Sequence, residues 1–254
     1  MLETVASLAY MSNLSNPYTA EWFESKHDGS LSSARSVLPL VFSHVRHESV
    51  VDVGCAVGAW LSVAQQLGVQ RILGIDGEYV PRSKLMITEF IAADLTGPFA
   101  IPSKFDLAIC VEVAEHLPPS SADHLVTQLT TLASVVLFSA AVPLQGGHNH
   151  FNEQWPEYWA DKFSEHGFVC YDAIRKRIWM NEDIDAWYRQ NMLIFSRQPI
   201  DAWATDRVER PLPLIHPLLR VVDRPAPGLR KTLRSLPELA LQSFRSRVLQ
   251  RGPR

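Results

Sequence analysis

Two glutamates and a histidine stand close together in the middle of the chain, at Glu112, Glu115 and His116. Their spacing is i, i+3 and i+4, so a helical turn would project all three side chains to one side. Carboxylates and an imidazole that face one point suit a divalent cation such as Mg²⁺ or Mn²⁺. We therefore expect a metal site made by these three residues, completed by His148 or by its neighbour His150.

The same residues also allow chemistry without a metal. An imidazole titrates near neutral pH, so His116, His148 or His150 could act as a general base towards an acceptor hydroxyl, with Glu115 beside it. A third interpretation is structural: Glu112 packs against its surroundings, and the next residues simply begin a helix. The spacing alone leaves these three interpretations open.

The loop Gly146–Trp155 is unusually rich in polar side chains, with two histidines, two asparagines, a glutamate and a glutamine. Side-chain amides can bind the hydroxyls of a sugar, and an indole face such as that of Trp155 can stack on a pyranose ring. The composition favours a binding loop for a polar acceptor. A hydrogen-bonded structural lid is the alternative.

These groups must be positioned by an α/β scaffold whose first half is visible at Val50–Gly58 and Ile72–Gly77. The pattern predicts a buried strand, a glycine turn, a helix over 59–67 and a second buried strand that ends in Asp76. Glycines let the backbone turn tightly and let a ligand approach it, and an acid at the second strand end can accept hydrogen bonds from two ribose hydroxyls. The full G-x-G-x-x-G motif of a pyrophosphate cradle is absent.

The pattern D-x-G-x-x-x-G, here Asp52, Gly54 and Gly58, resembles motif I of the class I S-adenosylmethionine-dependent methyltransferases. The chain departs from most members at Ala56, which replaces their central glycine. The resemblance implies a Rossmann-like doubly wound, mostly parallel seven-stranded sheet with helices on both faces. It also implies a cofactor site with these members: Asp52, Gly54, Cys55, Gly58, Asp76, Gly77, Asp94, Leu95 and Glu112. Of these, the glycine loop should line the methionine end and the 94–95 pair should meet the adenine.

Two further resemblances concern the acceptor. Glu-x-x-Glu-His at 112–116 resembles a metal-binding signature of some small-RNA and quinone-pathway O-methyltransferases, in which the cation binds the acceptor hydroxyls. The segments 139–141, 152–159 and 188–191 look like a bacterial methyltransferase group with saccharide acceptors. This resemblance covers residues 18–196. It implies O-methylation of a saccharide or glycosylated metabolite, with another small metabolite or a non-catalytic adenosine-binding module as alternatives.

Hydrophobic patterning predicts the other strands and the helices of the domain. Strands are expected at 105–111, 135–141, 168–174 and 192–195, and helices at 32–44, 121–133, 156–166 and 183–189. The strand at 105–111 should deliver Glu112 to the ligand-binding edge, because ligands of such sheets bind at the carboxyl ends of the strands.

Composition divides the chain into three parts. We expect a lid or extension at 1–30, the methyltransferase domain at 31–200 and a basic, proline-rich appendage at 201–254. From Arg207 onward, eleven Lys or Arg stand against three acids, which leaves a charge of about +8 there and −11 in the preceding residues. An acidic body does not suit a nucleic-acid acceptor. The basic amphipathic segment 229–249 could contact a membrane surface, an acidic protein, its own domain or the second copy in a homodimer.

The cysteines, the lengths of the apolar runs and the N-terminal segment indicate the cellular compartment. Cys55, Cys110 and Cys170 are widely spaced and two lie in apolar runs, which is typical of reduced packing residues. No apolar run is long enough for a transmembrane helix, and the N-terminus has no secretory pattern. We expect a cytoplasmic enzyme.

Overall fold

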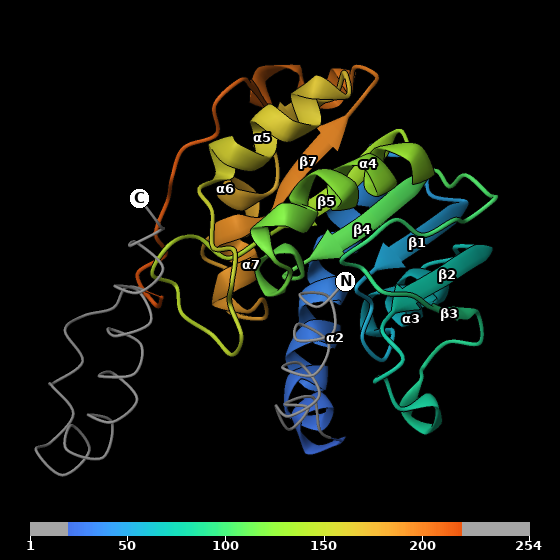
Figure 1. The fold of residues 1–254 in the computed structure, drawn as a ribbon. Coiled ribbons are helices and arrows are strands. Elements are labelled where there is room, and N and C mark those ends of the chain that lie inside the picture. Colours follow the sequence, from blue (N-terminus) through green and yellow to red (C-terminus); the bar gives the residue numbers. More distant parts are fainter. Residues whose placement is uncertain (1–19, 220–254) are drawn as a thin grey trace, which may run out of the picture. The chain divides into compact units, whose positions relative to one another are not determined.

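The computed structural model describes residues 20–219, and side-chain surroundings from residue 28 onward. Within this range the protein is built on an eight-stranded sheet with the order β3-β2-β1-β4-β5-β7-β6-β8 (Figure 1). The strands are β1 Ser49–Val53, β2 Arg71–Asp76, β3 Phe90–Ala92, β4 Leu107–Val111, β5 Val135–Ser139, β6 Val169–Tyr171, β7 Leu193–Ser196 and β8 Arg207–Val208. The five strands β3, β2, β1, β4 and β5 are mutually parallel. Strands β7 and β8 run antiparallel to their neighbours. The Rossmann-like, mostly parallel fold is confirmed.

The eighth strand is one more than the sequence predicted. β8 has two residues and pairs with Cys170 and Tyr171 of β6. Two residues cannot display an alternating pattern, and the prolines at 211 and 213 that follow point away from a strand. This strand therefore leaves no signal in the sequence.

Helices cover both faces of the sheet (Figure 1). They are α2 Ala20–Phe42, α3 Ala59–Gln66, α4 Ala122–Leu132, α5 Pro156–Glu165, α6 Arg175–Ile178 and α7 Ala186–Asn191, with one-turn 3₁₀ helices at Arg82–Lys84, Ala114–His116 and Pro119–Ser121 and a kinked one at Asp201–Asp206. Apolar side chains of α2 and α3 form one core with one face of the sheet, and those of α4 and α5 form a second core with the other face. Among the described residues, no helix is long and apolar enough to span a membrane.

The first helix of the described residues, α2, differs from the prediction. It begins at Ala20, so residues 20–30, which the sequence assigned to a lid, are continuous with the helix expected from Ser32. The helix also runs through Pro39. The remainder of the expected lid, residues 1–19, lies outside the described residues.

The carboxyl end of the domain also lies further along than Ile200. The compact unit extends to Leu219, because Trp203 is buried in the α2 and α3 core and Asp206 is ion-paired with Lys176 and Arg177. Residues 201–219 therefore belong to the body and not to the basic appendage. The amphipathic segment 229–249 lies outside the described residues.

Strand register brings four loops to one edge of the sheet. Val53 pairs with Ile75, and Val111 pairs with Ser139, so β1, β2, β4 and β5 end at nearly the same level. The loops after these strands carry the glycine turn, Asp76, Glu112–His116 and the 140–155 segment. The candidate cofactor and acceptor residues are therefore collected at the carboxyl edge, where ligands of such sheets bind.

Candidate active site

The loop between β1 and α3 depends on left-handed backbone conformations. Gly54 and Gly58 have φ angles of 84° and 87°, which glycine adopts without strain. Ala56, which replaces a glycine of motif I, also has a positive φ, 49°. The loop is held to the end of β2, because the amide of Gly54 donates to the carbonyl of Ile75 over 2.7 Å.

Asp76 lies at the centre of this loop arrangement and is only 3% exposed. Its Oδ2 accepts a hydrogen bond from the amide of Ala56, 2.7 Å away. Its Oδ1 accepts from the amide of Gly77 at 2.7 Å and from the hydroxyl of Tyr79 at 2.5 Å. Burial raises the pKa of Asp76, while these three hydrogen bonds act in the opposite direction. Asp76 and Gly77 were predicted from the sequence, whereas Tyr79 was not.

Asp52 and Cys55 turn into the protein. Asp52 is 2% exposed, and its Oδ1 makes no hydrogen bond with the described residues. Burial, and then the nearby charge of Asp76, raise the pKa of Asp52 well above its ordinary value. The Cys55 side chain packs into the α2 and α3 core, so only its backbone can line a ligand.

Asp94 follows β3 and is exposed. Its Oδ1 accepts hydrogen bonds from the backbone amide of Thr96 at 2.9 Å and from the Thr96 hydroxyl at 2.7 Å. The carboxylate thus stabilises the turn that follows. Leu95 is buried in the core beside α4.

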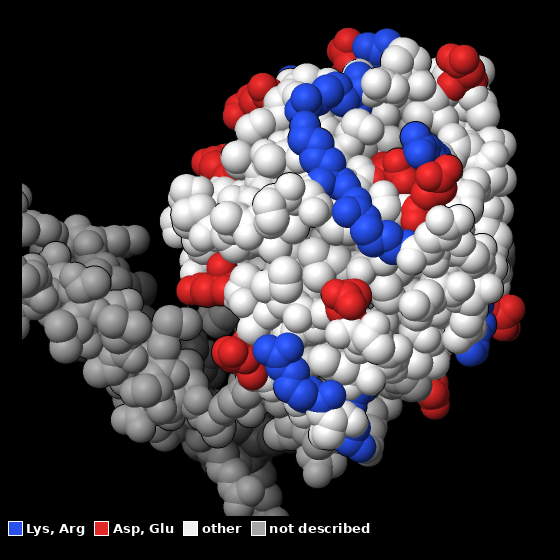
Figure 2. All heavy atoms as spheres, turned by 90° about the vertical axis from the view of Figure 1, so that its right-hand side faces the viewer, with Lys and Arg blue, Asp and Glu red and all other residues white. Residues whose placement is uncertain are grey.

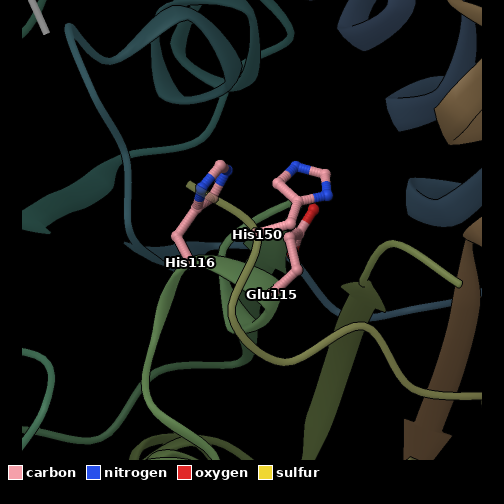
Figure 3. A group of neighbouring side chains, drawn as sticks. All are labelled: Glu115, His116 and His150. Carbon is pink, nitrogen blue, oxygen red and sulfur yellow. The ribbon is translucent and has the colours of Figure 1, made fainter. Parts of the chain in front are cut away.

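Glu115, His116 and His150 form a compact group at the ends of β4 and β5. One ligand atom from each residue lies within 4.8 Å of those of the other two. Figure 3 shows that the three side chains project to the same side of the chain. The two imidazole rings are 4.8 Å apart between centroids and nearly perpendicular. Two nitrogen ligands and one carboxylate form a donor set that a divalent transition metal can accept.

The electrostatics of this group favour a cation. Glu115 is fully buried, and neither of its carboxylate oxygens makes a hydrogen bond of normal geometry with the described residues. Burial, and then the charge of Glu112, raise the pKa of Glu115 well above its ordinary value. Burial, and then the proximity of His150, lower the pKa of His116 to about 4, so this imidazole is neutral at pH 7. A neutral imidazole is the form that binds a metal.

His150 is oriented by Glu153. Its Nδ1 lies 2.9 Å from Oε1 of Glu153, whose two oxygens also accept hydrogen bonds from the amides of Leu144 and Gly146. The ring packs over Gly147, where a Cβ atom would lie 2.2 Å from Nε2 of His150. Glu153 therefore builds the loop and positions His150. From the sequence, Glu153 was expected to contribute to acceptor binding, and this positioning role was not predicted.

Glu112 and His148 do not join the group, contrary to the predicted metal set. Glu112 has a φ of 55°, and the following 3₁₀ turn begins only at Ala114. The left-handed residue interrupts the helical continuity on which the i, i+3, i+4 argument depended. His148 is exposed. Of the two histidines that the sequence offered to complete the site, it is His150 that lies beside Glu115 and His116.

Glu112 is bound instead by two amide side chains. Its Oε1 accepts from Nδ2 of Asn191 at 3.1 Å, and its Oε2 accepts from Nε2 of Gln145 at 3.3 Å. Gln190 links the two, because its Nε2 donates to the side-chain oxygens of both Gln145 and Asn191. This network joins α7 to the loop after β5. The segment 188–191 was singled out from the sequence, but its hydrogen bond to Glu112 was not predicted.

The glycine loop and the Glu115 group are neighbours in space. A Cβ atom at Gly54 would lie 2.3 Å from the side chain of Val113, two residues before Glu115. The loop that would hold a methyl donor therefore packs directly against the segment that would hold an acceptor. Such proximity is what group transfer between two bound molecules requires.

Comparisons with known proteins identify the family of the chain. A family model described as a methyltransferase domain matches residues 26–184. The ribosomal RNA large subunit methyltransferase E of Methanoregula boonei is 28% identical over 136 residues, which cover 50% of this chain and 69% of that protein.

The fold is shared with solved structures, of which two are described. An O-methyltransferase family protein from Burkholderia thailandensis has a TM-score of 0.53 and 13% identity, over 71% of this chain and 61% of that chain. DesVI from Streptomyces venezuelae has a TM-score of 0.52 and 11% identity, over 70% of this chain and 95% of that chain. At these identities the likeness is one of fold.

Proposed function

Because the chain belongs to the methyltransferase-domain family, as a class I S-adenosylmethionine-dependent methyltransferase, we propose that it methylates a hydroxyl of a saccharide or glycosylated metabolite. The observation that carries the acceptor proposal is the group of Glu115, His116 and His150, packed beside the glycine loop. It supplies ligands or a base for a hydroxyl at the place where the donor methyl should arrive.

We assign the donor to the β1 and β2 loops. Asp76 would hold the ribose, because it is an acid at the end of β2 whose carboxylate faces the glycine loop. The backbone of Gly54, Cys55 and Gly58 would line the methionine end. The 94–95 pair would meet the adenine through the loop after β3.

We assign a divalent cation to Glu115, His116 and His150. A fully buried carboxylate whose oxygens make no hydrogen bond of normal geometry is costly unless a cation compensates its charge, and the neutral imidazole of His116 can coordinate that cation. A bound cation would orient the acceptor hydroxyl and lower its pKa. The imidazole ligands favour Mn²⁺ or another transition metal over Mg²⁺.

Methyl transfer without a metal is the second candidate, and the contact between His150 and Glu153 supports it. A carboxylate that accepts from Nδ1 fixes the imidazole tautomer and leaves Nε2 as the basic atom. His116 is less suitable as a base at neutral pH because its pKa is lowered. In this mechanism His150 takes the hydroxyl proton while the methyl group moves to the oxygen.

The exposed rings of the loop after β5 support a sugar acceptor. Phe151 and Trp155 are both exposed, although Asn152 between them is buried. The indole of Trp155 is therefore accessible for stacking, whereas Asn152 and Glu153 contribute to the loop itself. We expect the sugar to lie between these rings and His150.

A nucleic-acid acceptor is less well supported, although the Methanoregula relative is named for ribosomal RNA. Basic side chains of the body are often paired with acids, as in Arg46 with Glu48, Arg82 with Glu78 and Lys162 with Asp123. Figure 2 shows one face on which a run of basic side chains has acidic side chains near one end, and a smaller basic group below it also lies next to acidic side chains. A nucleic-acid surface would need unpaired positive charge near the active site.

The donor assignment can be tested by calorimetric titration with S-adenosylhomocysteine. Asp76→Ala should weaken binding at least tenfold, because the ribose loses its charged acceptor. Asp161→Ala, an exposed acid on α5, is the matched control and should leave the Kd unchanged. Equal affinity in Asp76→Ala and the wild type would contradict the assignment.

The metal assignment can be tested by chelation and by substitution. Methyl transfer to a saccharide panel, followed as S-adenosylhomocysteine release, should stop in EDTA and return with Mn²⁺. Glu115→Gln and His150→Ala should bind Mn²⁺ at least tenfold more weakly, whereas His148→Ala, outside the group, should behave as wild type. Activity that persists in EDTA but is lost in His150→Ala would favour the metal-free mechanism.

A further inference from the structure

The carboxylate of Asp76 has fewer free acceptor positions than a ribose requires. Each carboxylate oxygen can accept about two hydrogen bonds. Oδ1 already accepts two, from the amide of Gly77 and the hydroxyl of Tyr79, and Oδ2 accepts one from Ala56. One position remains, on Oδ2, whereas a ribose presents two neighbouring hydroxyls.

Of the three donors, only Tyr79 can leave without moving the backbone. The amides of Ala56 and Gly77 belong to the main chain that shapes the site. Tyr79 is a side chain on the loop after β2 and is 44% exposed, so rotation of its side chain can carry the hydroxyl towards solvent. Its ring lies over Gly77, where a Cβ atom would be 2.2 Å away, so the absence of a side chain at Gly77 permits this position.

We propose that the hydroxyl of Tyr79 occupies a ribose-binding position on Asp76 and competes with the vicinal diol of a nucleoside. This inference rests on the proposed function, because it takes Asp76 as the ribose-binding acid. When the donor binds, the hydrogen bond from the Tyr79 hydroxyl to the Asp76 carboxylate is replaced by one from a ribose hydroxyl. Tyr79 thereby lowers the affinity for every nucleoside ligand that carries both hydroxyls.

The test compares wild type and Tyr79→Phe in calorimetric titrations with S-adenosylhomocysteine. Removal of the competing hydroxyl should lower the Kd by about three- to tenfold, since the ring remains and only a hydrogen bond to a charged group is lost. Tyr158→Phe, on α5, is the matched control and should not change the Kd. If Tyr79→Phe does not fold, Tyr79→Leu also lacks the hydroxyl and should change the Kd in the same direction.

A second ligand isolates the diol. The gain in Tyr79→Phe should also appear with adenosine and should disappear with 2′,3′-dideoxyadenosine, which cannot compete for Asp76. An unchanged or higher Kd for S-adenosylhomocysteine in folded Tyr79→Phe would overturn the inference and leave the proposed function intact. An equal gain in affinity for adenosine and for 2′,3′-dideoxyadenosine in Tyr79→Phe would also overturn the inference. Failure of the wild type to bind S-adenosylhomocysteine would overturn both.

Discussion

The backbone conformation of Glu112 affects which residues lie in the group of Glu115, His116 and His150. The positive φ of this residue turns its carboxylate to Asn191 and Gln145, so that it interacts with Glu115 but is not part of the group of Glu115, His116 and His150. Non-glycine residues in this conformation are strained and are concentrated at functional sites. The strain is stabilised here by the two amide hydrogen bonds to the carboxylate.

Asp52 provides a prediction at the same scale. The pKa of Asp52 in the folded protein is above its unfolded value of about 4, so the folded protein binds this proton more tightly. The contribution of the protonated Asp52 carboxyl to the free energy of unfolding is therefore lost as pH rises through the folded pKa. Asp52→Asn carries no charge and should therefore raise the free energy of unfolding at pH 7 by about 1–3 kcal/mol. Thermal unfolding between pH 4 and pH 8 would show the gain disappearing near pH 4. A gain independent of pH would contradict this account.

The β1 loop shows how an element is shaped by its neighbours. Gly54 has both a positive φ and no room for a Cβ atom beside Val113, whereas Gly68, after α3, has a positive φ but open space around it. The two positions therefore separate backbone strain from steric crowding. The crowding reflects the direct contact between the glycine loop and the side chain of Val113.

Substitution of these glycines should have unequal effects. Gly68→Ala should lower the free energy of unfolding by about 1 kcal/mol, which is the cost of the left-handed backbone alone. Gly54→Ala should lower it by about 2–4 kcal/mol, because the Val113 side chain must also move. Chemical denaturation of both variants measures the difference. Equal losses would mean that Val113 adapts without cost.

The whole molecule is completed by residues 201–219, which follow the last long strand. This segment adds β8 to the sheet edge, buries Trp203 to 1% exposure and pairs Asp206 with two basic residues of α6. The side chain of Trp203 also contacts the ring of His44 near the end of α2. The segment thus connects the sheet edge to the first helix.

A chain that ends at Ile200 should therefore be less stable than one that ends at Leu219. Trp203→Ala alone should lower the free energy of unfolding by about 3–5 kcal/mol, which is typical of a buried tryptophan. Trp155→Ala, at an exposed position, is the matched control and should change it by less than about 1 kcal/mol. Similar unfolding temperatures for the two truncated chains would place the domain boundary back at Ile200.

Much of the fold could be predicted because its signals are local. Near-continuous apolar runs marked β1, β4 and β5, and periodic apolar positions marked α4 and α5. The start of α2 and the existence of β8 were missed, because the polar residues 20–30 and the two-residue strand carry no clear period. Tertiary contacts decide both.

The sequence by itself determined the α/β class, the glycine loop and the acid at the end of β2, since each follows from residue type and near neighbours. Only the tertiary structure decided that His150 joins Glu115 and His116, that Glu112 turns to Asn191, and that Tyr79 binds Asp76. The first two of these choices depend on the φ angle of Glu112 and on loops that meet across the sheet edge, and the third depends on the conformation of the turn after β2. Spacing along the chain cannot specify them, because it contains no information about which loops come together.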